Sequence, residues 1–142
     1  MQTFLPDKDF FKSAQTLDNR RLYKQIVECK QIYLALTEGN SKWINHPAVK
    51  MWKGYENVLL DYMMYCFQEW QMRRYPMLRA NSFIFYTEHP KNLPRELPPW
   101  LGNEVFHKSH RLNLLWKDPE HYSQYFKEPI PTEKPPYVWP EV

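Results

Sequence analysis

The sequence has little glycine and little cysteine, and each shortage excludes a common class of protein. Its three glycines, Gly39, Gly54 and Gly102, are far apart. A glycine-rich phosphate loop and a dinucleotide-binding fingerprint both need closely spaced glycines, so neither is present. The two cysteines are too few for a disulfide-rich secreted module.

Long hydrophobic runs are also missing. A helix needs about 20 consecutive apolar residues to cross a bilayer, and the longest candidate, around residues 58–67, contains Asp61. The first seven residues lack the basic stretch and apolar core of a signal peptide. We therefore expect no membrane partner and a cytoplasmic location, associated with the nucleoid or, for a viral protein, in the host cytoplasm.

Aromatic residues and basic charge stand out among the residues that are present. The 142 residues fit one domain spanning 1–142. Aromatic residues make up 17% of the chain, more than so small a core can bury, so some rings should lie at the surface or in a site. The formal net charge of +3 arises entirely within residues 1–75, which points to a basic region in the first half.

Apolar spacing predicts a mainly α, single compact domain with about three main helices. Asp18 is a good N-cap for a helix that runs to about residue 37, with an apolar stripe at spacings of three and four. A second helix of about 27 residues should follow Pro47 and run to about residue 74. A third should span about 103–117, ended by Asp118-Pro119.

The remaining segments are short or rich in proline. Residues 1–16 suggest an extended start and a short helical turn capped by Asp7 or Asp9, and residues 120–126 suggest one further turn. Ten of the 13 prolines follow residue 89, which predicts an irregular loop over 90–99. From Glu128 onward the chain should be extended and packed against the body. The single alternating pattern, a candidate short strand, is at residues 82–86.

The helix predicted over 18–37 carries a basic face with one acid in it. Arg20, Arg21, Lys24 and Gln25 accompany Glu28 on or near the side opposite the apolar stripe. One interpretation is an ordinary solvated helix face with a Lys24–Glu28 pair. The alternative is a phosphate-binding face whose single carboxylate stays ionised beside cations and acts electrostatically or as a base.

A second polar cluster lies in the third predicted helix. His107, His110 and Arg111 share one helix face, next to Lys108 and Ser109. Two histidines at this spacing are compatible with a metal site completed by His46, His121 or a cysteine. A cluster of donors without an acid suits an anion better, and we expect no metal. A serine or cysteine nucleophile paired with histidine stays open, although no GxSxG elbow is present.

The two clusters resemble parts of the phage pyrimidine-dimer DNA glycosylases of the endonuclease V type. The stretch from Leu17 to Leu22, followed six residues later by Glu28, resembles the helix that carries the catalytic glutamate of that family. The stretch 109–112, then Pro119 and the aromatic run 121–126, resembles its third helix. A bacterial branch of the family is similar over nearly the whole chain, including residues 1–6, 46–49, 51–52, 106–110 and 137–140.

The resemblance implies a glycosylase that also cleaves the DNA strand by β-elimination and needs no cofactor. The α-amine at the chain start, here that of Met1, would form a Schiff base with the sugar, and Glu28 would be the catalytic acid. An ordinary α-amine has a pKa near 8, roughly two units below that of lysine. The partner would be double-stranded DNA with a damaged or modified base, bound by a monomer. The predicted DNA-binding residues are Gln2, Thr3, Arg20, Arg21, Lys24, Gln25, His107, Lys108, His110 and Arg111.

The sequence differs from the phage enzymes at positions that matter for this mechanism. Gln2 stands where they expose a threonine after removal of the methionine, so the nucleophile would be the Met1 amine or an amine exposed by an unexpected cut. Val27 and Gln31 stand where arginines would be expected, which leaves the lesion open. With Met1 retained, residues 1–5 should fold back over the middle of the 18–37 helix, and Phe4 and Leu5 should be buried.

Two other functions remain compatible with the sequence. A non-catalytic nucleic-acid-binding module would use the same basic face without forming a covalent adduct. An enzyme acting on a small nucleotide or base would use the cations to bind one phosphate, so its affinity would not depend on duplex length.

Overall fold

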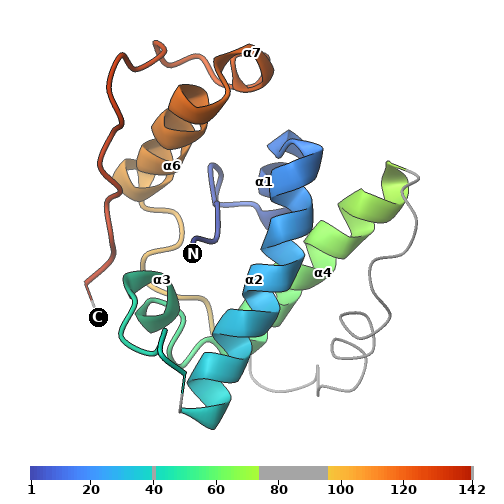
Figure 1. Cartoon of the computed structure of the whole chain (residues 1–142), viewed down its shortest axis with the longest axis vertical. Coiled ribbons are helices and arrows are strands. Elements are labelled where there is room, and N and C mark those ends of the chain that lie inside the picture. Colours follow the sequence, from blue (N-terminus) through green and yellow to red (C-terminus); the bar gives the residue numbers. More distant parts are fainter. Residues whose placement is uncertain (40, 74–95, 142) are drawn as a thin grey trace.

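The computed structural model describes residues 1–39, 41–73 and 96–141, which contain six helices and no strand (Figure 1). The helices are α1 (Phe10–Thr16), α2 (Asn19–Glu38), α3 (Pro47–Lys50), α4 (Glu56–Met72), α6 (Glu104–Lys117) and α7 (Pro119–Tyr122). The predicted mainly α fold is therefore confirmed. Within these residues no helix has the length and apolar character to span a membrane.

The helix ends follow the capping signals in the sequence. The Asp9 side chain accepts hydrogen bonds from the first turn of α1, and Asp18 accepts one from the Arg21 N–H at the start of α2. Gly39 ends α2 with a φ of 73°, in the left-handed region that suits glycine. Asn103 caps α6. The predictions for the helices over 18–37 and 103–117 are confirmed to within one or two residues.

The predicted helix of about 27 residues after Pro47 is wrong. The structure has the short α3 and the longer α4, separated by a turn that contains Gly54 with a φ of 87°. In this turn Met51 and Trp52 are buried in the core. The free energy gained by burying these two large side chains outweighs the helical hydrogen bonds that the turn gives up. The predicted end near residue 74, the candidate strand at 82–86 and most of the loop at 90–99 lie outside the described residues.

The core forms where α2 and α1 both pack against α4. Leu22, Ile26 and Cys29 of the predicted stripe are fully buried, as are Leu59 and Tyr62 of α4. The stripe on α2 continues through Ile32 and Ala35. Both cysteines are buried and free.

The N-terminal segment, residues 1–7, crosses the middle of the molecule between α2 and α6 (Figure 1). The C-terminal segment, residues 128–141, runs along the outer side of α6 from α7 toward α3, as predicted for an extended tail packed on the body. The Val138 N–H donates to Ser109 Oγ at 3.1 Å, and the ring of Trp139 lies 6.0 Å from that of His46. The two ends of the chain thus enclose α6.

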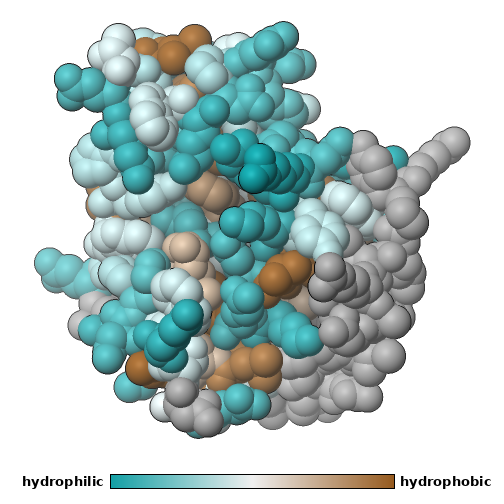
Figure 2. All heavy atoms as spheres, viewed as in Figure 1, coloured by the Kyte–Doolittle hydropathy of each residue, from teal (hydrophilic) through white to brown (hydrophobic). Residues whose placement is uncertain are grey.

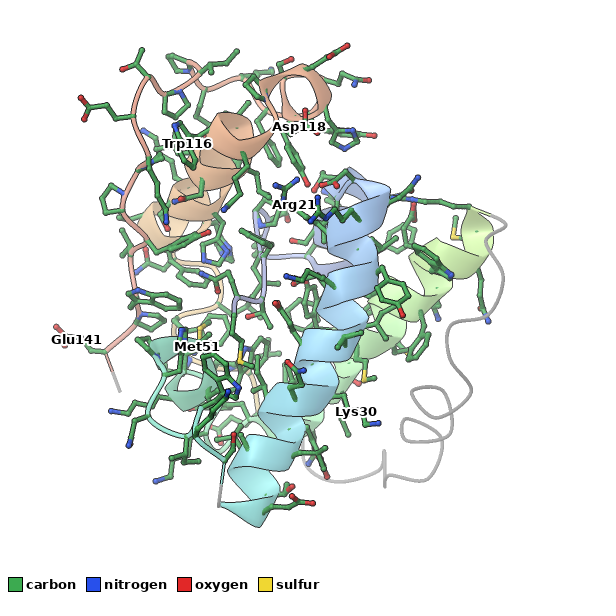
Figure 3. All side chains as sticks on the ribbon, in the orientation of Figure 1. Arg21, Lys30, Met51, Trp116, Asp118 and Glu141 are labelled. Carbon is green, nitrogen blue, oxygen red and sulfur yellow. The ribbon has the colours of Figure 1, made fainter. Side chains whose placement is uncertain are left out.

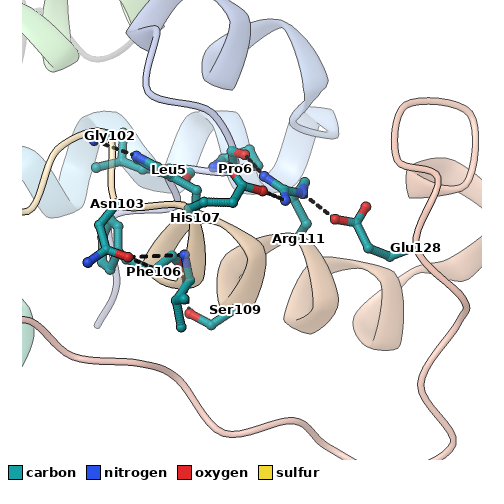
Figure 4. A network of polar contacts seen from close by, with 11 residues as sticks. Leu5, Pro6, Gly102, Asn103, Phe106, His107, Ser109, Arg111 and Glu128 are labelled. Atoms are coloured by element: carbon teal, nitrogen blue, oxygen red, sulfur yellow. Dashed lines mark hydrogen bonds and ion pairs between the residues drawn. The ribbon is translucent and has the colours of Figure 1, made fainter.

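Two histidines of α6 bind the backbone of the N-terminal segment, and Figure 4 shows one of them, His107, beside Leu5. The Leu5 N–H donates to His110 Nδ1 at 2.8 Å, and His107 Nδ1 lies 2.7 Å from the Leu5 carbonyl, to which it donates. The Gly102 N–H donates to the other nitrogen of His107 at 2.9 Å. Each ring accepts one backbone N–H, His110 at Nδ1 and His107 at its other nitrogen, so both imidazoles are needed in their neutral forms.

This arrangement predicts that stability decreases in mild acid. Burial lowers the pKa of His110 to about 3, and burial also lowers the pKa of His107. Below about pH 6.5 an unfolded chain binds protons that the folded protein does not, so the free energy of unfolding falls between about pH 6.5 and 3. The slope should reach about 1.4 kcal/mol per pH unit from His110 alone, and His107 adds to it.

Urea unfolding at a series of pH values measures this slope. The variant His110→Asn retains an acceptor for the Leu5 N–H but does not titrate, so it should be less stable at pH 7.5 and have a shallower slope. Equal slopes in the two proteins would contradict the assignment of His110.

Candidate active site

A pocket of about 420 Å³ lies where α2, the N-terminal segment, the end of α6 and the C-terminal segment meet. It is lined by Met1, Gln2, Phe4, Arg20, Arg21, Lys24, Gln25, Glu28, Lys117, Lys134 and Tyr137. Figure 3 shows Arg21 on the side of α2 that faces α6 and α7. The face of the molecule drawn in Figure 2 is largely hydrophilic, with scattered hydrophobic patches. The pocket itself is polar because charged and amide side chains dominate its lining.

The chain terminus and Glu28 meet in this pocket. The Gln2 N–H donates to Glu28 Oε2 at 3.3 Å. Backbone geometry then places the Met1 nitrogen within about 7 Å of that oxygen. Phe4 and Leu5 are buried, so the prediction that residues 1–5 fold over the middle of this helix is confirmed.

The Glu28 carboxylate is partly buried, and positive charges lie around it. Burial raises its pKa, while the hydrogen bond from Gln2 and the positive charges of the terminus and Lys24 act in the opposite direction, with a net increase. A carboxyl group with a raised pKa at the centre of a pocket is typical of acid–base sites.

Positive side chains from three parts of the chain surround this carboxylate. Arg20, Arg21 and Lys24 come from α2, Lys117 from the end of α6 and Lys134 from the C-terminal segment. Burial, followed by the charges of Arg21, Lys134 and Lys24, lowers the pKa of Lys117. Cations are brought together here against their mutual repulsion, which an anionic ligand would relieve.

Arg21 is held in place by groups at the start of its helix. Its guanidinium forms an ion pair with Asp18 at 3.1 Å. The Tyr122 hydroxyl of α7 donates to the same carboxylate. Burial would raise the pKa of Asp18, but the hydrogen bonds from Tyr122 and Arg21 outweigh it and lower that pKa. Asp18 therefore stays ionised and orients Arg21 at the edge of the pocket.

The pocket also contains residues that sequence reasoning missed. Lys117, Lys134 and Tyr137 are far from α2 in the chain and belong to no repeating pattern with it. Burial raises the pKa of Tyr137 to about 12, and its ring packs on Phe4 and His110. The sequence gives only weak local signals for them: Lys117 is the basic end of a predicted helix, and Lys134 and Tyr137 lie in the aromatic C-terminal segment.

Gln2, whose backbone N–H donates to Glu28, has a side-chain amide without hydrogen-bond partners. Its side chain is 6% exposed, and neither its amide nitrogen nor its amide oxygen has a hydrogen-bond partner. Buried polar atoms without partners are uncommon and are often satisfied by a ligand or by water. Gln2 stays a predicted DNA-binding residue, as do Arg20, Arg21 and Lys24.

Four other predicted DNA-binding residues have side chains that are buried and bonded inside the protein, and their contact with DNA stays a prediction. Thr3 is fully buried and accepts a hydrogen bond from Trp52 Nε1 at 3.0 Å. His107 and His110 are buried against Leu5, as described above. Gln25 is buried beneath the N-terminal segment. In the free protein these four side chains therefore support the site from within.

Arg111 and Lys108 also lie outside the pocket. Arg111 donates to the Pro6 carbonyl at 2.9 Å and forms ion pairs with Glu128, at 2.6 Å, and with Glu104 (Figure 4). Its charge is therefore used to join α6 to both chain ends. Lys108 is exposed beside the prolines of the C-terminal segment rather than beside Glu28.

The other candidate chemistries of the sequence have no assembled site among the described residues. No group of three or more His, Cys, Asp or Glu there could hold a metal ion. Burial raises the pKa of both cysteine thiols, that of Cys66 to about 12, so neither is an activated nucleophile. A larger hollow of about 890 Å³ beside α1 and α7 contains Arg111 and Glu69 but neither Met1 nor Glu28.

Comparison with known proteins gives one match. Residues 1–80 match the family described as pyrimidine dimer DNA glycosylase. No curated protein and no solved structure matches the chain. The matched region includes the N-terminal segment and α2, whereas α6 and the C-terminal segment follow it.

The raised pKa of Glu28 predicts that its charge costs stability. Above its folded-state pKa the carboxylate is ionised where burial disfavours it, and this cost disappears as the pH falls through that pKa to below the ordinary value. Glu28→Gln should therefore have a Tm equal to or higher than that of the unmodified protein at pH 7, as is common at functional sites. The difference should vanish near pH 4, which thermal unfolding at both pH values measures. A clearly lower Tm at pH 7 would mean that the charge of Glu28 serves the fold.

Proposed function

The chain belongs to the pyrimidine dimer DNA glycosylase family, and on this basis we propose that it is a DNA repair glycosylase with an associated β-elimination lyase activity. Its substrate is double-stranded DNA with a damaged or modified base, such as a pyrimidine dimer. We propose that it acts as a monomer in the cytoplasm and needs no cofactor.

One observation carries this proposal: the start of the chain and Glu28 share a cationic pocket. The Gln2 N–H is 3.3 Å from Glu28 Oε2, and the amine of Met1 precedes that N–H by one residue. An α-amine supplies a neutral nucleophile near physiological pH more readily than a lysine does. A nucleophile, an acid–base group and phosphate-binding cations are the parts that this reaction needs.

The proposed reaction proceeds in two steps on the sugar. The neutral Met1 amine attacks C1′ of the damaged nucleotide, the bond from C1′ to the base breaks, and the base leaves with its electron pair and takes up a proton. Opening of the sugar ring gives an imine between the Met1 nitrogen and C1′. Glu28 then removes a proton from C2′, the C3′–O bond breaks, and the 3′ phosphate leaves.

The cations of the pocket bind the DNA backbone in this proposal. Arg20, Arg21 and Lys24 line one wall, and Lys117 and Lys134 line the other. Contacts of this kind fix the position of the strand and carry no sequence information. They also stabilise the negative charge on the leaving phosphate.

Borohydride trapping tests the mechanism. Duplexes with a single abasic site or a single pyrimidine dimer should give a covalent adduct with the unmodified protein, whose retention of Met1 is verified by intact mass. Acetylating the terminal amine, or adding one residue before Met1, should abolish the adduct while leaving DNA affinity within about threefold.

The Glu28→Gln variant is the companion to this experiment. It should bind the same duplexes but lose strand cleavage by about 100-fold or more, as expected of an essential acid–base group. DNA binding without any adduct in the unmodified protein would instead favour a non-catalytic binding module. Affinity for a mononucleotide equal to that for a duplex would favour an enzyme acting on a small nucleotide.

The salt dependence of DNA binding tests whether the basic residues that line the pocket contact phosphates. Arg21→Ala, Lys24→Ala and Lys117→Ala should each weaken duplex binding and reduce the slope of log K against log salt by about one. Lys53→Ala removes an exposed lysine outside the pocket and should leave the slope unchanged. Arg111→Ala should lower the Tm with little effect on the slope. Fluorescence anisotropy between about 50 and 200 mM salt measures this, and slopes equal to that of Lys53→Ala would remove these residues from the interface.

A further inference from the structure

Gln25 uses its whole carboxamide beneath the N-terminal segment. Its side chain is 1% exposed. Its Nε2 donates to the Gln2 carbonyl at 3.0 Å, and its Oε1 accepts from the Phe4 N–H at 2.7 Å. The side chain thus pairs with two alternate residues of the segment as a neighbouring strand would.

The orientation of this amide is fixed by its partners. The Phe4 N–H can only donate and the Gln2 carbonyl can only accept, so the oxygen and nitrogen of Gln25 cannot be exchanged. The Tyr62 hydroxyl, 2.6 Å from the Phe4 carbonyl and 2.9 Å from Gln25 Oε1, adds a further contact from α4. The two backbone partners are enough to fix the geometry of the amide, and the hydroxyl adds only packing stability around it.

The same amide also reaches the carboxylate of the site. Gln25 Nε2 lies 3.4 Å from Glu28 Oε2, the oxygen that also accepts from the Gln2 N–H. Gln25 and Glu28 are one helical turn apart on α2, so they share a face. One nitrogen therefore joins the backbone of the N-terminal segment to Glu28.

We propose that Gln25 is a positioning residue that sets the separation between the Met1 amine and the Glu28 carboxylate. The proposal rests on the proposed function, because it concerns the same two groups. By holding Gln2 and Phe4, the amide fixes the backbone one residue from the amine. By holding Oε2, it leaves Oε1 of Glu28 for the C2′ proton. Displacements of about 1 Å at such a site cost roughly 100-fold in rate.

The variant Gln25→Glu tests the proposal. It retains the acceptor for the Phe4 N–H, but at neutral pH it lacks the donor to Gln2 and Glu28 and places a second carboxylate beside Glu28. In strand cleavage of abasic-site DNA, kcat at pH 8 should fall by about 10- to 100-fold, with KM changed by less than about threefold. At lower pH the two carboxyl groups, Glu28 and the one introduced at position 25, share a proton, which restores a hydrogen-bond donor. The kcat of Gln25→Glu, relative to that of the unmodified protein, should therefore rise as the pH is lowered to 6.

Tyr62→Phe is the matched control. It removes a hydroxyl from the same network but touches neither Gln2 nor Glu28, so it should lower the Tm while keeping kcat within about threefold and the pH profile unchanged. A Gln25→Glu protein with unmodified kcat and pH profile overturns the proposal. So does a Tyr62→Phe protein that reproduces the loss and the shift, because general loosening would then explain both. If Gln25→Glu does not fold, Gln25→Asn, whose amide is one methylene shorter, should show the fall in kcat.

The titration of Glu28 separates this proposal from the proposed function. If the unmodified protein forms no adduct, the proposed function fails, and carbon-13 NMR of the Glu28 carboxyl in the free protein decides the role of Gln25. An apparent pKa raised in Gln25→Glu and unchanged in Tyr62→Phe supports the contact on which positioning depends. An unchanged pKa in Gln25→Glu overturns it.

Discussion

The structure depends on burying an extended chain terminus whose backbone finds no strand to pair with among the described residues. Buried N–H and carbonyl groups must find partners, and here side chains supply them. Gln25 of α2 bonds residues 2 and 4, Tyr62 of α4 bonds the Phe4 carbonyl, and His107 and His110 of α6 bond Leu5. A terminus is normally mobile because ordering it costs conformational entropy. These contacts, together with the burial of Phe4 and Leu5, offset that cost and join the helices to one another.

The same constraint brings the terminal amine near a carboxylate. Holding residues 2–5 leaves Met1 at the edge of a pocket whose wall is α2, and Glu28 faces it from the middle of that helix. The site has an energetic cost, since burial raises the pKa of Glu28 and the cations around it repel one another. Sites that hold charge in this way trade stability for function.

The last third of the chain completes a site that the first half begins. The family match ends at residue 80, yet Lys117, Lys134 and Tyr137 line the pocket. Arg111 makes this possible by binding Glu128 and the Pro6 carbonyl together. The C-terminal segment is thereby fixed at its start, and the aromatic packing of Tyr137 and Trp139 fixes it further along. Its prolines restrict the unfolded chain, which lowers the entropy lost when it is ordered.

The sequence by itself determined the features that depend on near neighbours in the chain. The caps at Asp18 and Asn103, the apolar stripe of α2 and the placement of Glu28 among cations on one helix face all follow from spacings of three or four residues. The tertiary structure alone decided which polar side chains face solvent. His110 and Arg20 both lie on polar helix positions, yet His110 bonds to the backbone of a segment 105 residues away, whereas Arg20 is exposed. Helical periodicity shows which residues share a face, but the partner that covers that face comes from distant parts of the chain, whose approach no local pattern encodes.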